Sequence, residues 1–288
     1  MFSISRRQFL TVSAAGILSS GLAIPSLPVF AADKVKPKAG VQLYSVRGIC
    51  KGDKVPEIFK SLKEMGYVGV EFAGYYGKNA TELKKLLNDT GLEACGTHIG
   101  YGAIQPNEIA KTIDFNAEIG NKYLVVPGGV GGDEKAWLNH AEVFSKAAET
   151  AKKAGMYVGY HNHQHEFKDK FPDSGKCAWD VFFSNTSPDV FMQMDIGHCV
   201  AAGEDPLVWL KKFPHRLRTV HAKEVYGKGY DGVLGSYPEG GKHVDWDAVF
   251  PALESDGLEW YIVESEENPN ILNSVKGCVD FLKKKGRA

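Results

Sequence analysis

The sequence predicts a single-domain (β/α)8 barrel, and three observations support this fold class. Short apolar runs with strand character alternate with amphipathic helical patterns along most of the chain. There are eight such runs, and together with the helical patterns between them they extend over about 250 residues, which is the usual size of such a barrel. A regular alternation of strands and helices favours a parallel sheet covered by helices, and eight units are enough to close that sheet.

The chain begins with a segment, residues 1–31, that we expect to be a twin-arginine export signal. Arg6 and Arg7 precede an apolar stretch rich in Ala, Gly and Ser, and small or medium-sized residues lead to a cleavage site at its end. Residues 32–38 form the predicted linker and residues 39–286 the predicted barrel. The signal predicts a periplasmic protein.

The alternative to a cleaved signal is a short membrane anchor. Pro25 and Pro28 interrupt the apolar stretch, which is also short for a helix that spans a bilayer. We therefore expect no stable membrane anchor after cleavage.

Eight runs with strand character are predicted to form the strands of the barrel. They span residues 40–46, 67–74, 92–100, 122–129, 156–163, 190–197, 218–225 and 258–265. Between them lie patterns of helical period, such as residues 55–66 and 136–155, and in the first of these Ile58, Leu62 and Met65 share one face. Several helices are predicted to end at a glycine, which adopts the left-handed conformation without strain: Gly66, Gly91, Gly120, Gly155 and Gly257.

A doubly wound open sheet is the main alternative fold. It would place a glycine-rich phosphate-binding turn after the first strand, but residues 45–54, SVRGICKGDK, lack the GxGxxG spacing. The later segment GGVGG, residues 128–132, lacks the Lys-Ser/Thr pair of a phosphate loop. We expect this segment to form a tight turn after the fourth strand.

The composition is that of an ordinary globular protein. The 288 residues are 43% hydrophobic and 24% charged, and the formal net charge of −1 gives no reason to expect nucleic acid or an anionic membrane as a partner. The five cysteines are scattered and show no CxxC spacing, so we expect packed thiols, not a disulfide framework or a thiolate metal site.

Ionisable side chains are concentrated where the predicted strands end, which is where active sites form in a (β/α)8 barrel. They are Glu71, His98, His161, His163, His165, Glu166, Asp195, His198, His221, Lys223, Glu264 and Glu266. Alternate residues of a strand share a face, so pairs two residues apart in this set are expected to point the same way. Buried charged groups are usually paired or bound to metal. A ring of such groups suits one divalent cation, and Mn²⁺, Zn²⁺, Co²⁺, Fe²⁺ and Mg²⁺ all remain open.

Several of these residues have a structural interpretation as well. Asp195 could cap the helix that follows its strand. His163 and His198 are expected to bind substrate or support the metal ligands instead of contacting the ion. Glu71 could form an ion pair inside the barrel mouth, and Lys223 could be the structural partner of a nearby glutamate.

Five segments together resemble the sugar phosphate isomerase/epimerase family of xylose isomerase-like barrels. They are QLYSVR (42–47), YHNHQHEF (160–167), MDIGHCVAAGEDP (194–206), VHAKE (220–224) and VESEE (263–267). The resemblance extends from about residue 39 to about residue 285 and keeps the order of the family's motifs.

This resemblance implies one metal ion held by four residues of the last four strands. Carried over by motif, the ligands are His161, Asp195, His221 and Glu264. The chain departs from the family at strand five, where a histidine replaces the usual glutamate. Either His161 takes its place as ligand, which we favour, or Glu166 folds back to supply the carboxylate.

The resemblance also implies a substrate pocket beside the metal. His198 and Lys223 are expected to line it, and we expect Glu71, His98 and His163 to bind the substrate too. The partner is then a small-molecule carbohydrate. The sequence leaves the oligomeric state open, including a homo-oligomer.

We expect a metal-dependent enzyme of isomerase or epimerase type that acts on a keto-sugar or sugar derivative through an enediolate. Glu264 or Glu166 would remove the proton next to the carbonyl, and Lys223 or His163 would donate a proton or stabilise the oxyanion. Because a metal-bound imidazole at strand five would be a poor second base, β-elimination by a lyase or dehydratase on a 3-keto-glycoside or inosose is the alternative.

Two further functions have weaker support in the sequence. A non-catalytic carbohydrate-binding barrel would keep its sugar affinity without metal. A DNA phosphodiesterase of a related fold would need ligands for three metals and a basic cleft, and the balanced charge of the chain speaks against it.

Overall fold

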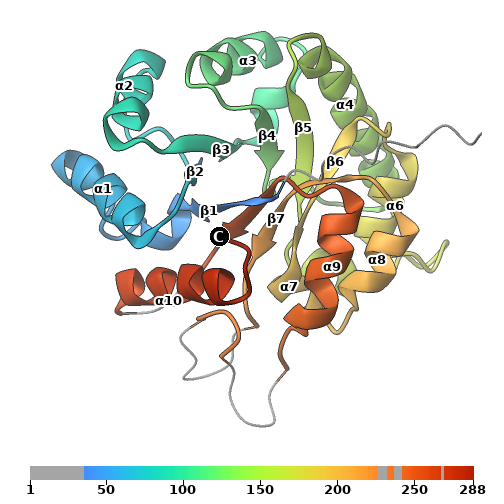
Figure 1. Ribbon diagram of the computed structural model, residues 1–288. Helices are drawn as coiled ribbons and strands as arrows, with labels where there is room; N and C mark the ends of the chain where they lie inside the picture. The colour runs from blue at the N-terminus through green and yellow to red at the C-terminus, as the bar shows by residue number, and fades with distance from the viewer. Residues whose placement is uncertain (1–35, 226–231, 237–241, 267–268) are drawn as a thin grey trace, which may run out of the picture. The chain divides into compact units, whose positions relative to one another are not determined.

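Eight parallel strands close into a barrel in the order β1-β2-β3-β4-β5-β6-β7-β8, and β8 pairs with β1. This computed structural model describes residues 36–225, 232–236, 242–266 and 269–288 (Figure 1). The predicted fold class is confirmed. The predicted export signal lies outside the described residues and stays a prediction.

The eight predicted strands are all present, but they are shorter than predicted. They are β1 Lys38–Gln42, β2 Gly69–Phe72, β3 Glu93–His98, β4 Tyr123–Val126, β5 Tyr157–His161, β6 Val190–Asp195, β7 Leu217–Ala222 and β8 Trp260–Val263. Residues 43–46 form a 3-10 helix, and Ile196 already belongs to a helix. Some residues that follow the strands, such as Ile99 and Ile196, are also apolar and buried, so hydrophobicity alone does not mark where the ladder stops.

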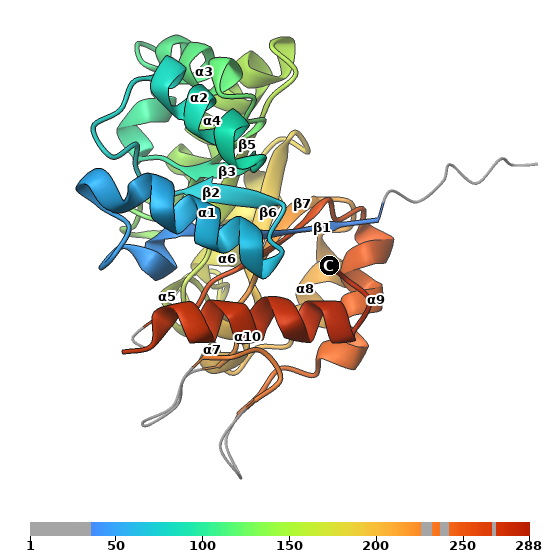
Figure 2. The same cartoon turned by 60° about the vertical axis from the view of Figure 1, so that its left-hand side comes forward.

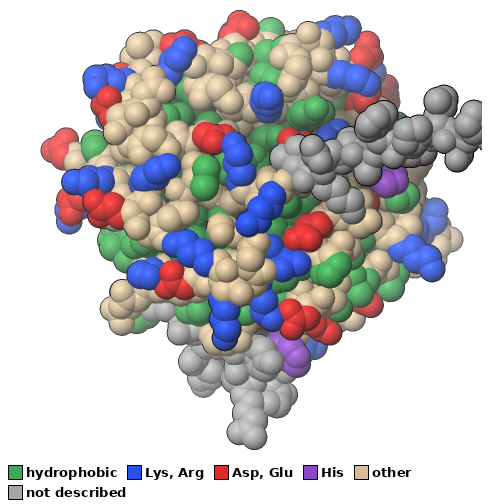
Figure 3. Space-filling view, in the orientation of Figure 1, with side chains coloured by type: hydrophobic (Ala, Val, Ile, Leu, Met, Phe, Trp, Pro, Cys, Tyr) green, Lys and Arg blue, Asp and Glu red, His purple; other side chains and the backbone are tan. Residues whose placement is uncertain are grey.

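Helices surround the barrel on its outer side (Figures 1 and 2). They are α1 Val55–Met65, α2 Ala80–Thr90, α3 Ile109–Glu118, α4 Glu134–Lys153, α5 His165–Lys168, α6 Ala178–Asn185, α7 Ile196–Ala202, α8 Pro206–Lys212, α9 Trp246–Asp256 and α10 Ile271–Lys284. Within the described part of the chain, no helix combines the length and the apolar character needed to cross a membrane. Basic and acidic side chains are interspersed over the face seen in Figure 3.

Helix α1 illustrates how the sequence pattern produces the outer layer. Val55, Ile58 and Leu62 recur at helical spacing and are buried, whereas the predicted Met65 is only half-buried because it lies in the last turn. Gly66 ends the helix with a φ of 106°. All five glycines predicted to end helices have positive φ, as expected for this role.

The inside of the barrel changes from apolar to polar along the strands. Near the strand starts, Cys95, Phe191 and Trp260 fill the interior, and Gly159 leaves room for Phe191, since a Cβ there would lie 2.6 Å from its ring. Toward the strand ends the interior side chains become amides, carboxylates and imidazoles. This polar layer supports the cavity above it.

Helix α7 packs closely against the end of β7, and a glycine permits this approach. A Cβ on Gly197 would lie 2.6 Å from the carbonyl oxygen of Lys223 and 2.8 Å from that of Glu224. Neither oxygen belongs to a flexible side chain, so the backbone itself would have to shift.

We therefore predict that Gly197→Ala destabilises the protein by about 1–3 kcal/mol through overpacking. Urea denaturation measures the change. Gly48→Ala is the matched control, because a Cβ there meets nothing within 4 Å. Equal stability of the two variants would contradict the packing described here.

Candidate active site

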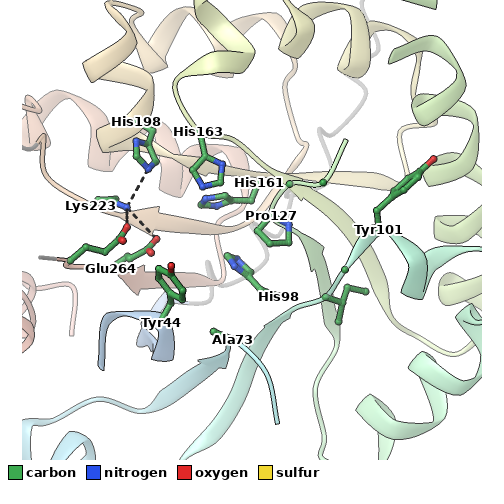
Figure 4. Close-up of a pocket in the computed structure, with 15 residues that line it drawn as sticks. Tyr44, Ala73, His98, Tyr101, Pro127, His161, His163, His198, Lys223 and Glu264 are labelled. Carbon is green, nitrogen blue, oxygen red and sulfur yellow. Dashed lines mark hydrogen bonds and ion pairs between the residues drawn. The ribbon is translucent and has the colours of Figure 1, made fainter. Parts of the chain in front are cut away.

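A cavity of about 860 Å³ opens at the carboxyl end of the strands (Figure 4). One part of its wall is polar and consists of His98, His161, His163, His198, Lys223, Glu264 and Glu266. Other lining residues have mainly apolar side chains and include Tyr44, Ile99, Tyr101 and Pro127. The turn after β4 contributes Gly128 and Gly129, so the predicted tight turn borders the cavity.

Four buried residues from consecutive strands meet at the floor of this cavity. His161, Asp195, His221 and Glu264 each offer a ligand atom, and these atoms all lie within 4.8 Å of one another. Asp195 and His221 are register partners on β6 and β7, which brings them to the same level of the barrel. The structure thus brings together the four residues that the sequence proposed as ligands.

Two atoms in this group are buried and lack any hydrogen-bond partner among the described residues. They are Nδ1 of His161 and Oδ2 of Asp195. The other oxygen of Asp195 accepts a hydrogen bond from the backbone N–H of His198 at 2.7 Å and caps α7. The capping interpretation of Asp195 is therefore correct, and it leaves the second oxygen available to the cluster. Unsatisfied buried groups are costly and point to a missing partner.

His221 is held between two carboxylates. Its Nε2 lies 2.6 Å from Oε2 of Glu71, and its Nδ1 lies 2.7 Å from Oε2 of Glu264. Burial alone would lower the pKa of His221, but Glu71 and Glu264 raise it to about 10. Because Nε2 is engaged by Glu71, Nδ1 is the nitrogen that faces the other three residues of the cluster.

Glu71 lies below the cavity and does not line it. Its carboxylate is fully buried and accepts hydrogen bonds from the side-chain amides of Gln42 at 2.6 Å and Gln193 at 2.7 Å. Burial would raise the pKa of Glu71, but His98 and His221 lower it. The expected direct contact with substrate is thus corrected: Glu71 forms the interior ion pair that was the alternative, because it sits one layer deeper than the cavity floor.

The remaining histidines and the lysine form the polar wall. His98 stacks on His221 with an interplanar angle of 7° and lies 2.9 Å from Oε1 of Gln193. Nζ of Lys223 lies 2.5 Å from Glu266, 3.6 Å from Glu264 and 3.2 Å from Nε2 of His198. The predicted pocket residues His98, His163, His198 and Lys223 all line the cavity.

Glu166 does not join the four-residue cluster. It has no exposed surface, and its oxygens contact the hydroxyl of Tyr160 at 2.7 Å, the backbone N–H of His163 at 2.8 Å and Nε2 of His165 at 3.0 Å. The short helix α5 turns Glu166 away from the cavity. The alternative in which Glu166 supplies the strand-five carboxylate therefore has no support in this geometry.

Some residues of the site were not anticipated from the sequence. Gln193 bridges Glu71 and His98 at the centre of the polar layer, and Gln42 supports Glu71 from β1. Gln193 precedes Asp195 by two positions, so strand parity could have placed it in the interior. Glu266 was noted at a strand end, but its role as the partner of Lys223 was not.

The chemistry of the cluster fits a divalent cation. Burial and the neighbouring imidazoles hold the pKa of His161 well below its usual value, so this ring is neutral. Burial would raise the pKa of Glu264, but Lys223 and His221 hold it well below its ordinary value, so Glu264 is ionised. Neutral imidazole and carboxylate are the ligands that Mn²⁺, Fe²⁺, Co²⁺ and Zn²⁺ accept.

Comparison with known proteins agrees with the fold. A family model described as xylose isomerase-like TIM barrel matches residues 59–285. The chain is 25% identical to the inosose dehydratase of Clostridium botulinum (strain Alaska E43 / Type E3) in an alignment that covers 83% of this chain and 96% of that protein.

Solved structures with a similar fold include two sugar-related proteins. A sugar phosphate isomerase/epimerase from Parabacteroides distasonis has a TM-score of 0.73 and 25% identity, with 88% of this chain and 96% of that chain covered. The 3-keto-D-glucoside 4-epimerase of E. coli has a TM-score of 0.62 and 21% identity over 86% of this chain and 100% of that chain, a likeness that shows the fold alone.

The raised pKa of His221 predicts that metal binding releases a proton. Below its pKa of about 10 the ring is protonated in the metal-free protein, and a cation must displace that proton from Nδ1. We expect about one proton released per ion between about pH 7 and 9, and fewer above about pH 10. Calorimetry in buffers of different ionisation enthalpy measures this number.

Glu71→Gln provides the matched comparison, because it removes a carboxylate that raises the pKa of His221. The variant should release fewer protons per ion at the same pH. Binding without proton release by the unaltered protein between about pH 7 and 9 would contradict the proposed role of His221.

Proposed function

The chain belongs to the xylose isomerase-like TIM barrel family, and on this basis we propose that it is a divalent-metal-dependent lyase or dehydratase acting on a keto-sugar or inosose. The observation that carries this proposal is the buried convergence of four metal-ligand side chains beneath a cavity. Two of their buried polar atoms, Nδ1 of His161 and Oδ2 of Asp195, make no hydrogen bond among the described residues.

His161, Asp195, His221 and Glu264 would hold the cation. When bound, a divalent cation supplies Lewis acidity that polarises the substrate carbonyl and stabilises the developing enolate. The chain's own residues must then position the substrate, remove the proton next to the carbonyl and protonate the leaving group.

Carboxylates and proton donors occupy different parts of the cavity wall. Glu264 and Glu266 come from the end of β8, and Glu264 is ionised, so it can accept the proton next to the carbonyl. Lys223 lies beside them, and the imidazole of His163 follows β5. Either of these groups can donate a proton to a leaving hydroxyl or alkoxide.

The β5 side of the cavity favours elimination over two-base epimerisation. An epimerase of the two-base type needs a base on each face of the substrate. Within the described residues, the carboxylate nearest in sequence to the β5 end is Glu166, which is buried and does not line the cavity. His161 is proposed as a metal ligand, and a metal-bound imidazole has no lone pair left to accept a proton. One-base β-elimination needs no such group.

The cavity also favours an uncharged substrate. Among the described residues that line it, Lys223 is the only lysine or arginine. Three carboxylates, those of Asp195, Glu264 and Glu266, lie within 4 Å of its Nζ. A phosphate group would have to compete with those carboxylates. The lining side chains of Tyr44, Ile99, Tyr101 and Pro127 offer apolar surface for a second ring or aglycone. We therefore favour an inosose or a 3-keto-glycoside over a sugar phosphate.

The isomerase or epimerase reaction expected from the sequence shares the same first step. It stays the second candidate, since proton removal next to a carbonyl precedes isomerisation, epimerisation and elimination alike. Export to the periplasm by the twin-arginine route remains part of the proposal, and it would expose the enzyme to neutral glycosides.

We predict that the metal-loaded protein in D₂O eliminates water from an inosose, or the aglycone from a 3-keto-glycoside. NMR follows both the release and the incorporation of deuterium next to the carbonyl. Glu264→Gln should slow the reaction by at least about 10²- to 10⁴-fold, because it removes a residue proposed both as the proton acceptor and as a ligand of the cation. Glu142→Gln is the matched control, since Glu142 lies on the surface in an i,i+4 pair with Lys146.

Three outcomes separate the candidate functions. Release of water or aglycone supports the lyase. Deuterium exchange without loss of a leaving group would favour the isomerase or epimerase instead, and sugar binding without any exchange would favour a non-catalytic barrel.

A further inference from the structure

We propose that His163, His165 and Glu166 form a second binding site for a divalent transition-metal ion, at the edge of the cavity. Each residue offers one ligand atom, and the three atoms lie within 4.8 Å of one another. The site shares no residue with the four-residue cluster, so it is an addition to the proposed metal centre.

The carboxylate of this site lacks a permanent cationic partner. Glu166 has no exposed surface, and no described lysine or arginine lies within ion-pair distance of it. Tyr160 and the backbone N–H of His163 donate hydrogen bonds to its two oxygens, which fixes the orientation of the carboxylate. Burying a carboxylate is costly unless a cation or several donors stabilise it. A metal ion at this position would supply the missing positive charge.

The two imidazole rings of the site lie next to each other. Nδ1 of His163 is buried and makes no hydrogen bond among the described residues. The ring of His165 is nearly parallel to that of His163, with centroids 5.8 Å apart, and its Nε2 lies 3.0 Å from Oε1 of Glu166. Nitrogen and oxygen ligands about 2.0–2.2 Å from one ion lie roughly this far from each other. The close approach of His165 to Glu166 therefore suits two ligands of a common cation.

The ligand set indicates which cations the site would take. Two imidazoles and one carboxylate form a common three-ligand set for Zn²⁺, and Co²⁺ accepts the same donors. The side chain of His165 is 62% exposed, so an ion can reach the site from solvent. His163 also lines the cavity, so an ion bound here would lie next to the substrate space.

A simple ion pair is the competing explanation. The hydrogen bond to Glu166 raises the pKa of His165, and a protonated His165 could stabilise the buried carboxylate without any metal. That arrangement leaves Nδ1 of His163 unused, whereas a shared ion would bind it. The number of ions bound per chain separates the two explanations.

The test is a Co²⁺ titration of the tag-free, metal-depleted full chain, followed by equilibrium dialysis and by visible absorption of the bound ion. We expect two equivalents of Co²⁺ for the unaltered protein and one for His165→Asn. His165 is chosen because its side chain is exposed, so its replacement leaves the buried contacts of Glu166 with Tyr160 and His163 in place. Circular dichroism and the melting temperature verify that each variant is folded.

His215→Asn is the matched control, because His215 is an exposed histidine with a φ of 61°, a conformation that asparagine tolerates. It should retain two equivalents. Asp195→Asn should lose the ion of the four-residue cluster and keep the other, so a failure of that centre is distinguished from a failure of this site. One equivalent for the unaltered protein with no change in His165→Asn, or two equivalents for His165→Asn, would overturn the proposal.

Discussion

The site depends above all on how His221 is held. Its ring lies between the carboxylates of Glu71 and Glu264, and Glu71 cannot move easily because the barrel interior surrounds it. The side-chain amides of Gln42 on β1 and Gln193 on β6 in turn fix Glu71. The hydrogen-bond network below the cavity therefore determines which nitrogen of His221 faces the other three residues of the cluster. A carboxylate that orients a histidine in this way is the usual second layer of a metal centre.

The four cluster residues could be predicted from the sequence, whereas their supporting layer could not. Topology brings the strand ends together and so predicts a ring of ionisable side chains there. The resemblance to the family's motifs then selects His161, Asp195, His221 and Glu264 from that ring. The depth of Glu71 was not predictable in the same way, because the strand pattern tells which side a residue faces but not how far along the barrel axis it lies. The position of Glu166 also escaped prediction, since a single short turn decides whether it folds back toward the cavity.

The replacement of the strand-five glutamate by His161 has consequences for the whole cavity. It leaves the carboxylates Glu264 and Glu266 on the β8 side, with imidazoles on the β5 side. Such an unequal arrangement suits a reaction with one base and separate proton donors better than one with two equivalent bases. The β5 end also carries the imidazole-carboxylate group of His163, His165 and Glu166. The histidines there therefore take part both in the proposed chemistry and in the proposed second cation site.

The central claim is that His161, Asp195, His221 and Glu264 together bind one divalent cation. Anomalous diffraction from crystals of the protein soaked in Mn²⁺ or Co²⁺ tests it most directly, because the signal locates the ion without reference to activity. The account predicts a peak bonded to Oδ2 of Asp195, Nδ1 of His221, His161 and Glu264, at about 2.0–2.3 Å from each ligand atom. Anomalous peaks elsewhere, with none among these four side chains, would contradict it.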